Sequence, residues 1–394
     1  MQVFKESRFQ QARFLRRPNR FIVECDTGGD VVRAHLPNPG RLRELLLPGS
    51  TVFLQRHRRD TGRKTGYTAV AVEREGEPVL LHTSATNDAA HRLLENGLVP
   101  GLEEYGVARR EVTVGRSRFD FLLEGRGEEL LLEVKSCTLF GKRIAMFPDA
   151  VTARGRRHVL ELASLADAGR KTGVLFIVHW PRAEFFLPEY HTDLLFSQAL
   201  AEVRKKVMVK AVAVSWNRDL TLSRRVREAV IPWEVLEREG KDGGAYLIVL
   251  RLPRKRRIRV GRLGEILFPK GFYIYVGSAL RGLERRVERH RRLRKKMHWH
   301  IDWLRSEAEF HGAFPVRTAD RLECELAQAM KKISEWDVPG FGSSDCGCPT
   351  HLFAMVSDPL SSPEFIGFLQ YQRIDRLTEG DCAAFFKKEG GGRG

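Results

Sequence analysis

Short apolar runs separated by turn residues fill the first part of the chain. They span residues 21–25, 31–35, 51–54 and 67–72, with Gly-Gly, Pro-Asn-Pro-Gly and Pro-Gly sequences between them. Runs of this length that end at glycine or proline are typical of strands. The pattern therefore predicts a small β-barrel of the OB kind, and we assign it to residues 1–84.

Helical and strand patterns alternate in the next part, residues 85–232. A first helix is expected at 87–96, because Asn87 is a capping residue and apolar residues follow at helical spacing up to Gly97. Further elements are expected as strands at 108–114, 174–179 and 209–214 and as helices at 158–168 and 194–206. Alternating strands and helices predict an α/β core.

A hairpin lies at the centre of this α/β part. Two apolar runs, 119–123 and 130–134, are separated by a charged sequence with two glycines at 124–128. Glycine-rich charged segments between apolar runs are typical of tight turns. The two runs are therefore expected to pair as neighbouring strands.

Three charged residues of this hairpin are candidates for a functional site. Alternate residues of a strand point to the same face, so Glu133 and Lys135 share one face while Leu132 and Val134 share the other. If the turn is short, the carboxylate of Asp120 in the partner strand comes within reach of Glu133. Two carboxylates and an ammonium group then lie together on a core strand.

The chemistry of Asp120, Glu133 and Lys135 suits phosphodiester cleavage. Paired carboxylates without a nearby histidine or cysteine suit a hard cation, Mg²⁺ or Mn²⁺, and a lysine beside them can polarise water or phosphate. The spacing resembles the PD-(D/E)XK nuclease motif. The alternative is a surface salt bridge between Glu133 and Lys135 on an edge strand, since such short patterns also occur by chance.

The composition of the chain favours a polyanionic partner. The 394 residues include 67 Lys and Arg against 50 Asp and Glu, a net charge of +17, which points to nucleic acid first and an acidic membrane surface second. A generally arginine-rich proteome is the alternative. Residues 1–20 contain no apolar run of signal-peptide length, and we expect a cytoplasmic protein without membrane association. The six cysteines are too scattered for a disulfide scaffold.

Basic residues concentrate in two places. One is a loop between two predicted barrel strands, where Arg56, Arg58 and Arg59 are candidates for binding single-stranded nucleic acid or form a solvated hairpin tip. The other is a predicted helix at 282–296, whose like charges repel at helical spacing unless phosphates offset them. Its candidate DNA-binding residues are Arg285, Arg289, Arg292 and Lys295. A solvated basic face is the alternative.

A third region follows a charged, glycine-rich segment at 237–244 that we interpret, together with Pro232, as a linker. Strands are expected at 245–252 and 271–278. Near its end, Cys346, Cys348 and His351 suggest either zinc ligation or packing, and Cys324 and Cys382 are further possible ligands in space. No second cysteine pair stands at zinc-finger spacing, so packing is the preferred interpretation.

Four segments resemble the SfsA family, named for sugar fermentation stimulation. They read H-L-P-N-P-G-R-L, R-R-E-V-T-V-G-R-S-R-F-D-F-L-L-E, L-E-V-K-S-C-T-L and F-P-D-A-V-T-A-R-G-R-R-H, and they follow that family's order over about residues 8–225. Members pair an OB-like barrel with a PD-(D/E)XK-like nuclease core and are associated with DNA binding. Pro39 departs from the family, which usually has threonine there.

The resemblance assigns roles to individual residues. It gives Asp120, Glu133 and Lys135 the positions of the nuclease motif, with Asp120 and Glu133 as metal ligands. Arg154 and His158, in the adjoining motif with Asp149, are expected to contact nucleic acid.

The third region resembles the GIY-YIG nucleases, and more closely a small GIY-YIG-like domain of unknown function that occurs alone or fused to endonuclease III. The matching segments are Gly-Ala-Tyr at 244–246, Tyr-Val-Gly at 275–277, H-W-H-I-D-W-L at 298–304 and F-G-S-S-D-C-G-C-P-T-H-L-F at 341–353. The resemblance implies that Tyr246 and Tyr275 position water, that Arg286 offsets phosphate charge, and that Glu323 holds a metal ion. Glu325 is the alternative for this last role.

Together these observations predict a multidomain protein with an OB-like β-barrel at 1–84, a PD-(D/E)XK-like α/β domain at 85–232 and a GIY-YIG-like α+β domain at 242–389. We expect DNA, and possibly RNA, as partner and Mg²⁺ or Mn²⁺ as cofactor of an endo- or exodeoxyribonuclease. The alternative is a non-catalytic, regulatory DNA-binding protein that retains nuclease-like folds. The sequence does not determine the oligomeric state, and a dimer is compatible with it.

Overall fold

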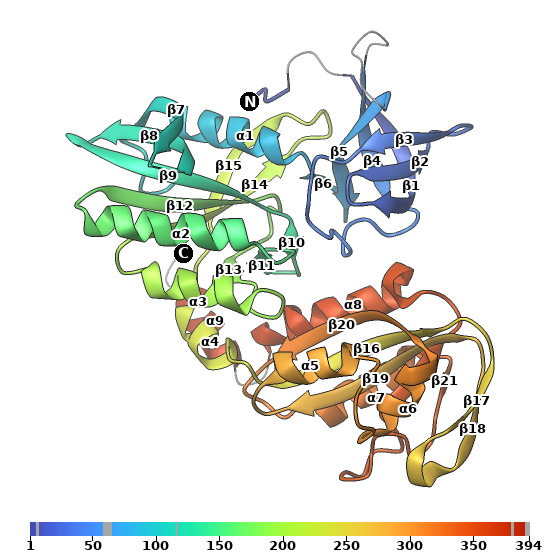
Figure 1. Ribbon diagram of the computed structural model, residues 1–394. Helices are drawn as coiled ribbons and strands as arrows, with labels where there is room; N and C mark the ends of the chain where they lie inside the picture. The colour runs from blue at the N-terminus through green and yellow to red at the C-terminus, as the bar shows by residue number, and fades with distance from the viewer. Residues whose placement is uncertain (5–7, 58–64, 116, 380–381, 391–394) are drawn as a thin grey trace. The chain divides into compact units, whose positions relative to one another are not determined.

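The computed structural model describes residues 1–4, 8–57, 65–115, 117–379 and 382–390. The chain divides into two compact units (Figure 1). The first unit contains Met1–Glu189, Leu195–Trp233 and Asp381–Gly394, and the second contains Tyr190–Leu194 and Glu234–Gly380. The three-domain division at 1–84, 85–232 and 242–389 remains a prediction. No helix among the described residues is both long enough and apolar enough to cross a membrane.

The first unit begins with a β-barrel, as the sequence predicted. Its sheet has the strand order β3-β2-β1-β4-β5-β6, and a parallel pairing of β3 with β5 closes it. The strands are β1 (Phe9–Asn19), β2 (Ile22–Asp26), β3 (Val31–His35), β4 (Thr51–Arg56), β5 (Tyr67–Arg74) and β6 (Glu77–Leu80). Strand β1 was not predicted, because only Ala12 and Phe14 are buried among its polar residues.

A six-stranded sheet forms the α/β part of the first unit. Its order is β15-β14-β12-β9-β8-β7, with β9, β12 and β14 parallel and the remaining strands antiparallel to their neighbours. The strands are β7 (Gly106–Val114), β8 (Ser117–Gly125), β9 (Glu128–Cys137), β12 (Lys171–Val178), β14 (Met208–Trp216) and β15 (Leu222–Glu228). A smaller sheet contains β10 (Leu139–Phe140), β11 (Ile144–Phe147) and β13 (Phe185–Pro188).

Helices cover both faces of this sheet (Figure 1). Leu93 of α1 (Thr83–Glu95) packs in one core with Leu132 and Val134. Leu162 of α2 (Ala153–Asp167) packs in another core with residues that include Leu131. Alternate residues of β9 therefore enter different cores, as its period of two predicted. Helix α3 (Leu194–Val203) lies in the same part of the chain.

Two helices of this part start earlier than predicted. Helix α1 begins at Thr83 rather than at 87, because the His82 ring accepts a hydrogen bond from the Ala85 backbone. Helix α2 begins at Ala153 rather than at 158, because the Thr152 hydroxyl accepts from the Gly155 backbone at 3.0 Å. A threonine that caps the backbone three residues later marks a helix start, and this signal in the sequence was missed.

The second unit is built on a five-stranded antiparallel sheet in the order β20-β16-β19-β22-β21. The strands are β16 (Gly244–Leu252), β19 (Gly271–Ala279), β20 (Glu309–Arg317), β21 (Trp336–Asp337) and β22 (Leu352–Met355), and β17 (Arg256–Arg259) pairs with β18 (Glu265–Phe268) as a hairpin. The helices are α4 (Trp233–Glu239), α5 (Leu283–Arg291), α6 (His300–Glu307), α7 (Glu323–Ile333) and α8 (Pro363–Arg373).

Two predictions about this region were wrong. The segment interpreted as a linker contains α4, which buries Val235, Leu236 and Glu239. The basic helix predicted at 282–296 ends at Arg291, and Arg292 adopts an extended backbone conformation. The residues beyond Arg292 turn back, so that Lys295 and the His298 backbone contact Asp302.

Each unit also takes a short segment from a distant part of the chain. In the second unit His191 accepts the Arg317 backbone N–H at Nδ1, at 2.9 Å, and its Nε2 lies 2.8 Å from the Arg373 carbonyl. In the first unit the ring of Phe386, from α9 (Ala383–Gly390), meets the ring of Phe185 edge-on at 4.8 Å. Each unit therefore contains residues that lie far along the chain from the rest of that unit.

Candidate active sites

A tight turn sets the register of the hairpin β8–β9. Arg126 and Gly127, with φ of 54° and 76°, form its two central positions. Two residues with positive φ make a type I′ turn, whose twist matches that of paired strands. Phe121 lies opposite Leu132 in the resulting ladder, so Asp120 stands beside Glu133. The short turn expected from the glycines is confirmed.

Glu133 is the most buried of the three charged residues of the hairpin, with 4% of its surface exposed. Its Oε1 accepts from Lys135 Nζ at 2.5 Å and lies 2.7 Å from His158 Nδ1. Its Oε2 is buried and, within the described part of the chain, has no hydrogen-bond partner. A buried carboxylate oxygen without a donor is costly unless something else binds it.

The tautomer of His158 follows from its two neighbours. Arg154 Nε donates toward His158 Nε2 at 3.4 Å, so Nε2 acts as the acceptor. The proton is then on Nδ1 and is donated to Glu133. His158 is 3% exposed, and this bond fixes the orientation of the Glu133 carboxylate.

Asp120 is held by two donors. The Val134 backbone N–H donates to Oδ2 at 2.7 Å, and the Asn87 amide donates to Oδ1 at 2.6 Å. Burial, and then the negative charge of Glu133, raise the pKa of Asp120 to about 6. Burial alone would raise the pKa of Glu133 as well, but the bonds from His158 and Lys135 outweigh it and leave that pKa lowered. The pKa of Asp120 is therefore raised while that of Glu133 is lowered, so the two carboxyl groups differ in acidity.

Asp120, Glu133 and Lys135 line a cavity of about 550 Å³. The barrel contributes Asn38, Pro39 and Gly40 to its wall. The Leu42 backbone N–H, also in the barrel segment, donates to Asp149 Oδ2 at 2.5 Å. A Cβ at Gly40 would lie 2.9 Å from the same Asp149 oxygen, so a side chain there would have to displace this carboxylate. Burial, and then Glu44, raise the pKa of Asp149 to about 7.

A second cavity, of about 210 Å³, lies in the second unit. It is lined by all four residues that the sequence proposed for a second active site, Tyr246, Tyr275, Arg286 and Glu323. The two tyrosines stand on the neighbouring strands β16 and β19, with ring centroids 6.4 Å apart. Tyr246 Oη lies 2.9 Å from His290 Nε2, and burial raises the pKa of both tyrosines.

Glu323 is the helical carboxylate of this cavity. Oε1 lies 3.2 Å from His351 Nδ1, and Oε2 accepts from the Ser278 hydroxyl. Burial would raise its pKa, but the bonds from His351 and Ser278 outweigh it and the pKa is lowered. Glu325, the alternative, is exposed and does not line the cavity.

Comparison with known proteins explains the architecture of the first unit. The family model of the SfsA N-terminal OB domain matches residues 15–81, and that of the sugar fermentation stimulation protein RE domain matches residues 84–219. The sugar fermentation stimulation protein homolog of Methanothermobacter thermautotrophicus is 39% identical over 222 residues, which cover 52% of this chain and 92% of that protein. The chain belongs to the SfsA family.

Two further SfsA proteins support this conclusion. The homolog of Pyrobaculum arsenaticum is 43% identical over 201 residues, which cover 50% of this chain and 84% of that protein. A solved structure of Pyrococcus furiosus SfsA, in complex with Ca²⁺, matches with a TM-score of 0.53 and 30% identity and covers 59% of this chain and 99% of that chain. In the second unit, the model of a domain of unknown function, DUF123, matches residues 245–368.

The residues of the SfsA part that were predicted to contact nucleic acid differ in their exposure to solvent. Arg56, at the end of β4, is exposed, and Arg154 lines the larger cavity. His158 is buried against Glu133 instead of facing solvent, so it does not suit contact with a phosphate. Arg58 and Arg59 lie outside the described residues.

The basic residues near α5 fall into two groups. Arg289 donates to both carboxylate oxygens of Asp302, at 3.1 and 3.0 Å, and Lys295 Nζ lies 2.9 Å from Asp302 Oδ1. The carboxylate of Asp302 is completely buried, so these two cations offset an internal charge and are not available as a phosphate surface. Arg285 and Arg292 are exposed, and their contact with DNA stays a prediction.

Sequence reasoning missed Asn87 and Asn38 as components of the larger cavity and left Asp149 without a role there. Asn87 was interpreted as a helix cap, but α1 starts before it and its amide therefore points to Asp120. Asn38 donates to the Leu81 carbonyl at 3.0 Å and accepts from the Gly40 backbone at 2.8 Å, which shapes the loop that faces Asp149. The signal was present in the motif H-L-P-N-P-G-R-L, which contains Asn38.

Proposed function

We propose that the SfsA part of the chain hydrolyses phosphodiester bonds in DNA with a divalent cation held by Asp120 and Glu133. The observation that carries the proposal is the Oε2 atom of Glu133, which is buried and has no hydrogen-bond partner in the described part of the chain. Asp120, whose carboxylate lines the same cavity, supplies a second acidic oxygen. Oxygen donors on a rigid wall suit a hard cation such as Mg²⁺ or Mn²⁺.

The residues present fit such a cation. Lys135 and His158 both bond to Oε1 of Glu133, so the group remains ionised and its second oxygen is left for a ligand. Asn87 and the Val134 backbone hold Asp120 in place. The relative from Pyrococcus furiosus was solved with Ca²⁺, another hard cation with oxygen ligands.

Each side chain then has a specific task. Asp120 and Glu133 would hold the cation, which would supply Lewis acidity for the phosphate and for the attacking water. Lys135 orients the attacking water or offsets charge on the scissile phosphate. His158 donates to Glu133 and keeps its free oxygen directed toward the cavity, a positioning role of the kind that residues behind metal ligands have.

DNA is the substrate that charge and fold favour. An OB barrel forms one wall of the cavity, and OB barrels bind single strands along a basic groove. Arg20 and Arg154 line the same cavity, and the whole chain carries a net charge of +17. A non-catalytic DNA-binding protein remains the second candidate, because the basic surface alone is enough for binding.

We propose that the second unit carries a separate site of the GIY-YIG kind. Four predicted residues from different elements line one cavity there, with two tyrosines, an arginine and a carboxylate. Arg286 would offset phosphate charge, the tyrosines would position water, and Glu323 would hold a cation. The burial of the tyrosines favours their neutral forms, which suits positioning rather than removal of a proton.

The test compares cleavage and binding in one set of variants of the full chain. Labelled single-stranded, duplex and branched DNA, and RNA, are incubated with Mg²⁺, Mn²⁺ or EDTA. Asp120→Asn and Glu133→Gln are expected to abolish cleavage and to retain or strengthen metal-free binding, because a charge that repels phosphate is lost. Glu129→Gln, an exposed carboxylate in the same strand β9, is the matched control.

The two sites are separated by a second set of variants, Tyr246→Phe, Arg286→Ala and Glu323→Gln. Cleavage that survives these changes but not Glu133→Gln belongs to the SfsA site, and the reverse pattern assigns it to the second unit. Tight binding of DNA without metal-dependent cleavage of any of these polymers would instead establish the binding protein.

A further inference from the structure

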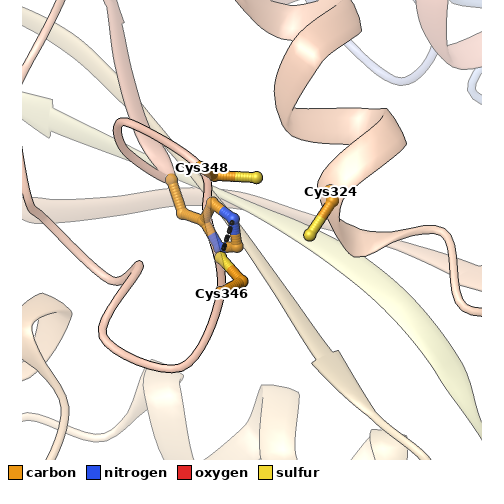
Figure 2. Close-up of side chains that lie close together, drawn as sticks. Cys324, Cys346 and Cys348 are labelled. Atoms are coloured by element: carbon orange, nitrogen blue, oxygen red, sulfur yellow. Dashed lines mark hydrogen bonds between the residues drawn. The ribbon is translucent and has the colours of Figure 1, made fainter.

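Three cysteines and a histidine converge in the second unit. Cys324 lies on α7, and the other three lie on the segment between β21 and β22. One ligand atom from each of Cys324, Cys346, Cys348 and His351 lies within 4.8 Å of all the others. Figure 2 shows the three sulfur atoms pointing into one space between the helix and the loop.

We propose that these four residues bind one zinc ion. Zinc in structural sites is tetrahedral, and bonds of about 2.3 Å to sulfur place its ligand atoms about 3.8 Å apart. A group of atoms already within 4.8 Å needs only a small inward shift to reach that geometry. Three cysteines with one histidine is a common structural zinc set.

The second nitrogen of the histidine also supports this assignment. His351 is 1% exposed, and its Nε2 lies 3.5 Å from Cys346 Sγ while its Nδ1 lies 3.2 Å from Glu323 Oε1. A carboxylate on Nδ1 fixes the proton there and leaves the Nε2 lone pair directed at the sulfur atoms. Metal-bound histidines regularly have a carboxylate on their other nitrogen.

The loop that carries two of the cysteines has little else to hold it. None of residues 342–349 is buried, and most of them are glycine, serine, aspartate or cysteine. Its two ends are tied, because the Gly340 N–H donates to Pro349 O and the His351 N–H donates to Phe341 O, each at 2.8 Å. Between these ties, burial of apolar surface contributes little, and metal ligation supplies the missing stabilisation.

Packing, which the sequence favoured, accounts for these cysteines less well. Cys25, Cys137 and Cys382 are buried, as cysteines that act as small apolar residues usually are. The three cysteines of the cluster are only partly buried. Cys382 is not a member of the cluster. An iron–sulfur cluster, which contains several iron atoms, would hold its ligand atoms farther apart than a single ion does.

The zinc site bears on the neighbouring cavity. Ser344 and Asp345 of the same loop line that cavity with Tyr246, and Glu323 contacts both the cavity and His351. A bound zinc therefore fixes one wall of the cavity and the orientation of Glu323. The zinc site itself does not depend on whether the cavity is catalytic.

The test is metal analysis of the full chain, purified under reducing conditions. We expect about one zinc per chain by mass spectrometry, no iron, and the visible d–d and thiolate charge-transfer bands of a tetrahedral site after exchange for Co²⁺. Cys346→Ser and Cys324→Ser are expected to lose the metal, whereas Cys382→Ser keeps it. Glu323→Gln is expected to keep the stoichiometry but weaken zinc affinity about 10- to 100-fold, and Glu325→Gln is its control.

Wild-type protein keeps the test decisive if a cysteine variant fails to fold. Zinc is expected to protect three of the six thiols from a thiol reagent, and a chelator is expected to expose them. Protein that binds no zinc after metal is added to the reduced apo form, that contains iron instead, or whose thiols react equally with and without zinc would overturn the proposal.

Discussion

His158 donates its Nδ1 proton to Glu133 across 2.7 Å, in a place where neither side chain is exposed by more than 5%. The bond joins α2 to β9 and leaves one oxygen of Glu133 for a ligand. His158 therefore acts on the proposed chemistry through Glu133 and does not need to touch DNA.

His158→Asn is expected to slow metal-dependent cleavage by about 10- to 100-fold, with little change in KM for DNA. The loss should shrink as Mn²⁺ is raised, because the variant holds the cation less tightly. Steady-state kinetics at several Mn²⁺ concentrations measure both effects. His91→Asn, on α1, is the control, and a rate loss that no Mn²⁺ concentration relieves would contradict the positioning role.

The exposed arginines near α5 should contact phosphates. Replacing Arg285 and Arg292 together with alanine is expected to weaken DNA binding and to lower the slope of log affinity against log salt by about one per residue. Fluorescence anisotropy at several salt concentrations measures this slope. Lys332→Ala, an exposed lysine on α7, is the control. An unchanged slope would place the DNA elsewhere.

Asp302 should be essential for the stability of the second unit. Its buried carboxylate accepts from Arg289, Lys295 and the backbone N–H groups of His298 and Trp299. Burial would raise the pKa of Asp302, but the His290 ring, and then Arg289 and Lys295, outweigh burial and hold this pKa well below its usual range. Asp302→Asn removes the buried anion that Arg289 and Lys295 share and is expected to cost about 3 to 5 kcal/mol of unfolding free energy.

Urea denaturation measures the effect of Asp302→Asn. Glu288→Gln breaks an exposed ion pair with Arg291 and is expected to cost less than about 1 kcal/mol. Equal effects of the two substitutions would show that the Asp302 cluster is not a stabilising centre.

The stability of the first unit should carry a pH dependence from His179. Trp216 Nε1, which is only a donor, bonds to His179 Nδ1 at 3.1 Å, so that nitrogen is unprotonated in the folded protein. Burial lowers the pKa of His179 to about 3. As the pH falls below about 6.5, this histidine is protonated in the unfolded chain but stays neutral in the folded chain. The free energy of unfolding therefore decreases by up to about 1.4 kcal/mol per pH unit.

The contribution of His179 is isolated by comparison with His179→Asn. Urea unfolding from pH 7.5 to 4.5 is expected to give a wild-type free energy that approaches that of the variant as the pH falls. His35→Asn, at an exposed position, is the control. Its free energy of unfolding should change between pH 7.5 and 4.5 by as much as that of the wild type. Parallel profiles for wild type and His179→Asn would rule out the linkage.

The hairpin could be predicted because its pattern is local. A period of two and a glycine turn determine which residues of β9 share a face, and the structure confirms that Glu133 and Lys135 meet. The closed barrel was predicted for the same reason, although β1 was hidden by its polar residues. The motifs that indicated the SfsA family are likewise short continuous segments.

What the sequence did not reveal depends on partners far along the chain. The sequence shows the positive charges of Arg289 and Lys295. It does not show that both form ion pairs with the buried carboxylate of Asp302. His158 was expected to contact nucleic acid, because the motif shows only the residue type. It does not show that α2 starts early, at Ala153, and that the His158 ring then faces Glu133. Cys324 joins Cys346 and Cys348 only once α7 is folded.

The interleaving of the two units along the chain has a consequence for synthesis on the ribosome. Residues 190–194 emerge early, yet His191 finds the Arg317 backbone only after roughly 120 more residues, about 6 to 25 s at usual rates of translation. The first unit receives Phe386, the partner of Phe185, only after about 200 more residues. The second unit is not complete until the residues around Arg317 and Arg373 have been made, and the first unit waits for α9, so the nascent chain must keep both partly finished surfaces from aggregating.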